Sequence, residues 1–157
     1  MVINEHKYLV LLHLIVVDIF EKNQALLYIA AENGHQPIVE FLVQSGANIN
    51  KKNKYGETPL CVAVEKGHQP IIEFLVQSGA NINKGDKYQK TPLYVAVEKG
   101  YHSIVRFLVK YGADIHHQTV EMKNPYIIAQ EYQHKEIIEY FDKLKKWIPG
   151  KYISQQN

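Results

Sequence analysis

The sequence is short of the residues on which several classes of function depend. It holds one cysteine, Cys61, and one arginine, Arg106, in 157 residues. A lone thiol cannot form a disulfide within the chain, so a reducing compartment is expected. The formal net charge is only +2, which is too small to require nucleic acid or membrane as a partner.

Long hydrophobic runs are also missing. Residues 9–17 are apolar apart from His13, but a membrane span needs about 20 residues. Read as a signal peptide, the N-terminus is poor, because its charges nearly cancel and no A-x-A cleavage site follows. The sequence therefore favours a cytoplasmic protein without a membrane segment.

Motifs for catalysis and for metal binding are absent as well. The chain has no G-x-S-x-G, no P-loop and no G-x-G-x-x-G. His116 and His117 are adjacent and cannot readily share one metal face, and no third ligand follows at zinc spacing. Glu65 and Glu98 occupy the same place in successive repeats, which indicates a solvated stripe. We expect no catalytic residues, no metal and no cofactor, and hence no enzymatic activity.

What the chain does contain is repetition. Residues 34–51 read GHQPIVEFLVQSGANINK, and residues 67–84 repeat them with Ile72 in place of Val39. A looser copy begins at Gly100, and ALLYIAAENGH, TPLCVAVEKGH, TPLYVAVEKGY and NPYIIAQEYQH begin 33 residues apart. A period of this length is typical of stacked supersecondary units.

One unit can be interpreted from its residues. Thr58 can cap a helix whose first turn holds Pro59, and Gly67 can end that helix in a left-handed conformation. A second, largely apolar helix is predicted from Gln69 to the glycine at position 79. Two short helices and a polar turn cannot bury this much apolar surface alone, so stacking of the units is expected.

The repeat resembles the ankyrin repeat. The family motif T-P-L-H-x-A is approached by TPLCVA at 58–63 and TPLYVA at 91–96, and Gly-Ala-Asn recurs at 46–48 and 79–81. The resemblance covers about residues 20 to 148 and implies an all-α solenoid of helix-turn-helix units joined by hairpin-like turns. The expected divisions are an N-terminal capping half-repeat at 1–19, repeats at 20–52, 53–85 and 86–118, a degenerate repeat at 119–148, and a flexible tail at 149–157.

The chain departs from this family pattern in two ways. The motif histidine is replaced at all four equivalent positions, so its polar contacts between repeats must be replaced or lost: Tyr28, Cys61, Tyr94 and Ile127. At its position Cys61 is expected to be a half-buried structural thiol rather than a nucleophile. The turn glycine at position 56 becomes Gln89 and then Met122, and the helix-ending glycine becomes Gln133.

The resemblance implies a binding face formed by the hairpin tips and the exposed side of the first helices. The expected partner-binding residues are Lys54, Tyr55, Glu57, Glu65, Lys66, Lys87, Tyr88, Lys90, Glu98, Lys99, Glu121, Lys123 and Tyr132. Tyr55 and Tyr88 suit a binding hot spot, because tyrosine covers area at little entropy cost. The alternative is that each tyrosine packs on the neighbouring hairpin.

These observations favour a non-catalytic, monomeric module that binds another protein, one with an acidic patch if the tip lysines attract it. Lysine at the tips can also serve solubility alone. The chain looks like stand-alone ankyrin proteins of intracellular bacteria or large DNA viruses, which implies a host-directed effector or adaptor. Nucleic-acid binding through the Lys/Tyr surface is the alternative, disfavoured by the single arginine and the interspersed glutamates. A scaffold that only self-associates also stays open.

Overall fold

The computed structural model describes residues 25–147, so the expected capping half-repeat at 1–19 and tail at 149–157 lie outside the described residues. The described chain is helical, without strands, as predicted from the sequence. After a helix over residues 25–32 come α2 (Gln36–Gln44), α3 (Pro59–Lys66), α4 (Gln69–Gln77), α5 (Pro92–Glu98), α6 (His102–Lys110), α7 (Pro125–Glu131) and α8 (Lys135–Trp147).

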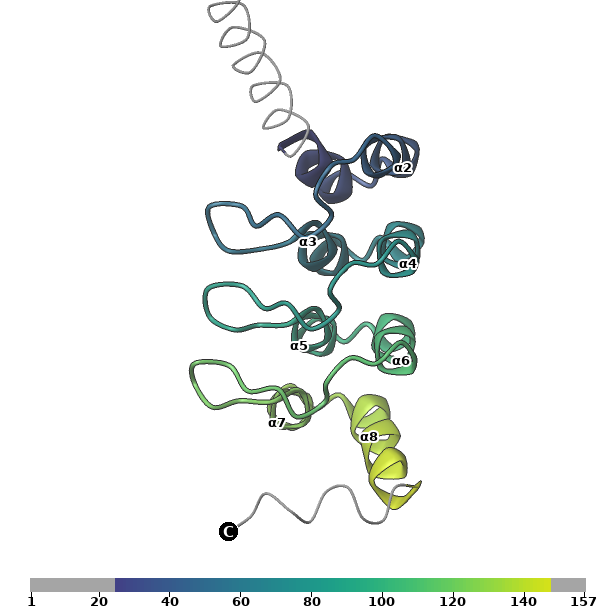
Figure 1. The fold of residues 1–157 in the computed structure, drawn as a ribbon. Coiled ribbons are helices and arrows are strands. Elements are labelled where there is room, and N and C mark those ends of the chain that lie inside the picture. The colour runs from purple at the N-terminus through teal and green to yellow at the C-terminus, as the bar shows by residue number, and fades with distance from the viewer. Residues whose placement is uncertain (1–24, 148–157) are drawn as a thin grey trace, which may run out of the picture.

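The helices stand in two columns (Figure 1). The helix over 25–32 and α3, α5 and α7 form one column, and α2, α4, α6 and α8 form the other. The loops that join one helix pair to the next project along one edge of the stack. The 33-residue period therefore corresponds to one helix pair and one projecting hairpin, which confirms the all-α repeat fold.

The helix starts follow from the capping residues. The side chain of Thr58 accepts a hydrogen bond from Cys61 N at 3.3 Å, and Asn124 accepts one from Ile127 N at 3.0 Å. Proline follows each of these caps within the first turn, where its missing N–H costs nothing. Gly67 ends α3 with φ 75°, as the sequence predicts.

The core lies between the two columns and runs the length of the stack. Equivalent residues of successive repeats fill it, and their side chains are almost wholly inaccessible: Leu60, Leu93, Ile72, Val105, Leu75 and Leu108. Burying one such side chain stabilises the fold by about 1.5–3 kcal/mol. Helices of successive repeats contact one another, α3 with α5 and α5 with α7, so the stack is the unit of stability.

A second series of contacts links the turns between paired helices. His68 Nε2 lies 3.0 Å from the carbonyl oxygen of Glu32, one repeat back. His134 Nε2 lies 3.4 Å from the carbonyl oxygen of Glu98, and the Tyr101 hydroxyl takes the equivalent place against Glu65 O at 3.5 Å. In these three turns, the residue at this position therefore ties the turn to the preceding repeat, which its place in the motif did not predict.

Candidate functional site

Each hairpin tip is closed by one polar side chain. Asn53 Oδ1 accepts hydrogen bonds from Tyr55 N at 2.9 Å and Glu57 N at 3.0 Å. Asp86 Oδ1 accepts from Tyr88 N at 2.8 Å and Lys90 N at 2.9 Å. Sequence reasoning missed these residues, although Asn and Asp commonly bond to the backbone two residues on in such turns. The tips are thus rigid platforms for the side chains between.

Tyr55 and Tyr88 occupy adjacent tips and are 49% and 51% exposed. The ammonium of Lys54 lies 4.9 Å from the centre of the Tyr55 ring. Lys87 stands between the two rings, 5.7 Å from that of Tyr55 and 5.0 Å from that of Tyr88. We call these four side chains the tip row: lysine and tyrosine alternate along it, held by cation–π attraction.

Other lysines of the hairpins hold the repeats together. Lys52 Nζ donates to the carbonyl oxygen of Gly85 at 2.6 Å, and Lys84 Nζ donates to that of Asn50 at 3.1 Å. These two ammonium groups therefore form hydrogen bonds between neighbouring repeats. Lys54 and Lys87 are the cations beside the rings of Tyr55 and Tyr88, whereas Lys90 lies over the ring of Tyr94 and pairs with Glu98.

The predicted site residues at the ends of the first helices form ion pairs between repeats. Lys66 Nζ lies 3.6 Å from Glu32, and Lys99 Nζ lies 3.8 Å from Glu65. Both pairs are about 40% exposed, and such pairs contribute about 0–1 kcal/mol each. They form a charged strip beside the hairpins.

Two lysines connect this strip to the tips. Lys90 Nζ is 2.9 Å from Glu98 Oε1, and Lys123 Nζ is 2.9 Å from Glu131 and 4.0 Å from Glu121. Hairpin tips and first-helix ends therefore lie side by side in both repeats. Beyond them, the exposed ring of Tyr132 stacks on that of His134 at a centroid distance of 6.0 Å.

The positions that lack the motif histidine are filled in different ways. The Tyr28 hydroxyl donates to Glu57 Oε2 at 2.9 Å, which restores a polar contact between repeats. Burial, and after it this hydrogen bond, raises the pKa of Tyr28. Burial likewise raises the pKa of Tyr94 to about 12. Both hydroxyl groups therefore stay neutral.

Cys61 is more enclosed than the half-buried thiol that the sequence predicted. It is only 4% exposed, and its Sγ donates to the carbonyl oxygen of Lys84 at 3.5 Å. Burial raises the pKa of the Cys61 thiol, an effect that hydrogen bonds with Thr58 oppose only in part. An inaccessible neutral thiol is a structural group and a poor nucleophile.

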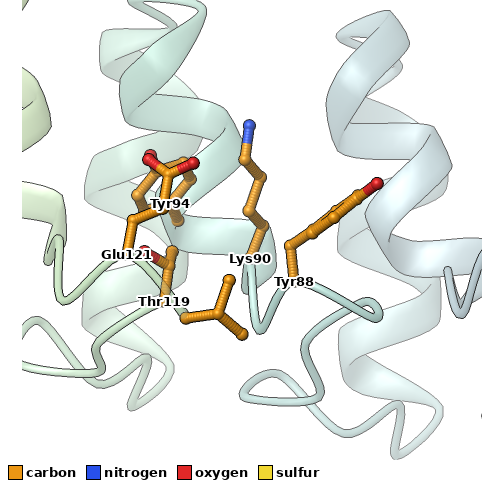
Figure 2. A pocket seen from close by; sticks show the side chains of 6 residues that line it. Tyr88, Lys90, Tyr94, Thr119 and Glu121 are labelled. Carbon is orange, nitrogen blue, oxygen red and sulfur yellow. The ribbon is translucent and has the colours of Figure 1, made fainter.

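A hollow of about 170 Å³ lies between the second and third tips. Figure 2 shows Lys90 standing between Tyr94 on one side and Tyr88 on the other, with Glu121 drawn in front of Tyr94 in this view. The residues lining it are Tyr88, Lys90, Tyr94, Thr119, Val120 and Glu121. The hollow could not be predicted from the sequence, because its walls come from two hairpins and from Tyr94 on α5.

Neither a metal site nor a membrane-spanning helix is found in the part of the chain that the structure describes. Among residues 25–147, no group of three or more His, Cys, Asp or Glu residues is placed to hold a metal ion. Over the same range, no helix is both long and apolar enough to cross a membrane.

Short helix pairs stacked at a fixed period, with hairpins along one edge, define a helical repeat protein. The family model for ankyrin repeats, which describes three copies of the repeat, matches residues 2–86, 27–119 and 85–146. The chain belongs to the ankyrin-repeat family. No curated protein matches it. Ankyrin repeats are generally protein–protein interaction modules without enzymatic activity.

Proposed function

We propose that this chain is a non-catalytic docking module that holds a partner protein against its hairpin tips and the adjoining ends of its first helices. The observation that carries the proposal is the tip row, in which Tyr55 and Tyr88 are half exposed on tips closed by Asn53 and Asp86. A rigid, partly exposed tyrosine gives up little entropy when a partner covers it. Binding hot spots are enriched in such residues.

The charge of the tip row supports a partner with acidic groups. The ammonium groups of Lys54 and Lys87 lie beside the tyrosine rings of the hairpin tips, and the hairpins project along one edge of the stack. A partner that brings carboxylates to this edge gains attraction, chiefly in its rate of association. The resemblance to stand-alone ankyrin proteins of intracellular bacteria or large DNA viruses extends the proposal to an adaptor or host-directed effector that works in a cytoplasm.

Nucleic acid is the second candidate, because lysine and tyrosine alternate along the tip row. The geometry favours it less. The tyrosine faces are approached by the chain's own lysines, so fewer ring faces are open to stacking bases. Glu98, Glu121 and Glu131 lie near the same edge and would repel a phosphate backbone.

The test is capture of partners from lysate, followed by titration of the captured protein against folded variants. The double variant Tyr55→Ala/Tyr88→Ala should weaken binding by at least about 2 kcal/mol, or roughly thirtyfold. The matched control is Glu40→Ala/Glu73→Ala, on α2 and α4, where each glutamate accepts a hydrogen bond from a glutamine four residues earlier. If binding is lost in the glutamate variant and kept in the tyrosine variant, the partner binds at α2 and α4, and the proposed site at the hairpin tips is wrong.

A further inference from the structure

We propose that the tips bind an extended acidic segment of the partner, whose carboxylates lie over Lys54 and Lys87 and whose neighbouring apolar side chain enters the hollow beside Val120. This inference rests on the proposed function and specifies the chemistry of the partner. It follows from the order in which charged and apolar groups succeed one another along the three described tips.

The first two tips set an upper limit on the spacing of the acidic groups. Lys54 Nζ and Lys87 Nζ lie 4.9 Å and 5.7 Å from the centre of the same Tyr55 ring. Because these distances bound their separation, the two ammonium groups are no more than about 11 Å apart. An extended chain rises about 3.3–3.6 Å per residue, so carboxylates two or three residues apart reach both groups.

The third tip differs in kind. Its lysine, Lys123, is held by Glu131 at 2.9 Å, while Val120 and Met122 expose their apolar side chains to solvent. Val120 N donates to the carbonyl oxygen of Tyr88 at 3.0 Å, which holds this apolar tip directly beside the tip row. The edge therefore passes from cationic and aromatic to apolar within one repeat.

The hollow is large enough for one apolar side chain. Its volume is about 170 Å³, and an engineered protein cavity of about 150 Å³ binds benzene. The ring of Tyr94, the stem of Lys90 and the side chain of Val120 supply apolar walls. Since Tyr88 belongs both to the tip row and to the hollow, the apolar residue of the segment must follow closely on its acidic pair.

The third tip also argues for a peptide over a nucleic acid. The side chain of Glu121 is 72% exposed and lines the hollow. A phosphate backbone continuing from Lys87 past this carboxylate would meet repulsion, whereas an apolar residue placed there carries no charge. An acidic segment that becomes apolar fits the full length of the edge.

The experiment selects random dodecapeptides on phage against the immobilised full-length chain. We expect enrichment of peptides with two Asp or Glu residues two or three positions apart, next to a Leu, Ile or Phe. A fluorescent copy of the leading peptide should bind Lys54→Gln/Lys87→Gln at least about fivefold more weakly, and Val120→Asp should reduce the preference for the apolar residue. Selected peptides without acidic pairs, or equal binding by the lysine variant, would overturn the inference.

Lys135→Gln/Lys143→Gln is the matched control, because it removes the same charge from exposed sites on α8. Equal weakening by this pair would reduce the effect to net charge and overturn the inference. Displacement of the peptide by an equimolar oligo-dT strand would also overturn the inference. If partner capture depends on Tyr55 and Tyr88 while the selected peptides are not acidic, this inference fails and the proposed function stands.

Discussion

Residues 34–51 and 67–84 are nearly the same sequence in two places, yet their outward side chains meet different surroundings. Ile38 is 48% exposed, whereas Ile71, its equivalent, is 1% exposed. Phe41 is 67% exposed, whereas Phe74 is partly buried against the core. Local sequence cannot cause this difference, because both stretches form the same helix.

The cause is the neighbour in the stack. Ile71 is buried in α4, which contacts α2 of the preceding repeat, whereas the described residues contain no repeat before α2, which carries Ile38. His68 differs from His35 in the same way, since it reaches back to Glu32 and His35 is exposed. A residue in such a fold is structural or available according to its place in the stack as well as its type.

The largest effect is expected from truncating the isoleucine of each copy. Ile71→Ala should lower the free energy of unfolding by about 2–5 kcal/mol, because it leaves a cavity between repeats. Ile38→Ala should cost within about 1 kcal/mol, because half of that side chain already meets solvent. Urea denaturation of the two variants measures the contrast. Equal costs would contradict it and indicate that residues 1–24 or a second copy cover Ile38.

A smaller effect is expected at the glycines against which the rings of His68, Tyr101 and His134 pack. A Cβ on Gly100 would come within 2.8 Å of the His134 ring, so Gly100→Ala combines a clash with a left-handed backbone and should cost about 1–3 kcal/mol. Gln133 holds the same left-handed conformation, φ 58°, and the described chain has no later repeat to press on it. Gln133→Gly should therefore stabilise by up to about 1 kcal/mol, as thermal unfolding can establish. A loss of stability at Gln133→Gly would count against this explanation.

Replacing His68 should lower the free energy of unfolding by about 1 kcal/mol more than replacing His35. His68→Ala removes the contact with the Glu32 carbonyl oxygen and the packing on Gly34, which should cost about 1 kcal/mol. His35→Ala should stay within about 0.5 kcal/mol, since the side chain is exposed. Denaturant midpoints of the two variants decide the matter, and identical midpoints would mean that the turn-to-repeat contact contributes nothing.

The last prediction concerns the pH dependence of stability and the thiol at the position of the missing motif histidine. Because burial raises the pKa of Cys61 above its ordinary value of 9.0, the unfolded chain loses this proton first. Stability should fall by up to about 1.4 kcal/mol per pH unit above pH 9. Between pH 8 and 10, Cys61→Ser should flatten this fall, because the ordinary pKa of Tyr28 and Tyr94, 10.0, lies above that of Cys61 and their contribution begins at higher pH. An unchanged slope would contradict the burial of the thiol.

Residues acting within one repeat could be predicted from the sequence, and residues acting between repeats largely could not. The period, the Thr58 cap, the left-handed turn at Gly67 and the apolar face of α4 all follow from local patterns. The hollow beside Val120 depends on the distance between two successive repeats. The contact of His68 depends on the carbonyl oxygen of Glu32 in the preceding repeat. The sequence pattern of a single repeat contains neither the spacing between repeats nor the contacts that one repeat makes with the next.

Two exposed surfaces could receive a partner, and site-specific photo-crosslinking separates them most directly. Benzoylphenylalanine is placed at Tyr55, at Tyr88, or at the exposed Phe41 of α2, one position at a time, and the proteins are irradiated in lysate. The account predicts adducts of one partner at both tip positions and none at Phe41, because the tips present rigid aromatic anchors beside cations. Adducts at Phe41 with none at Tyr55 or Tyr88 would contradict it.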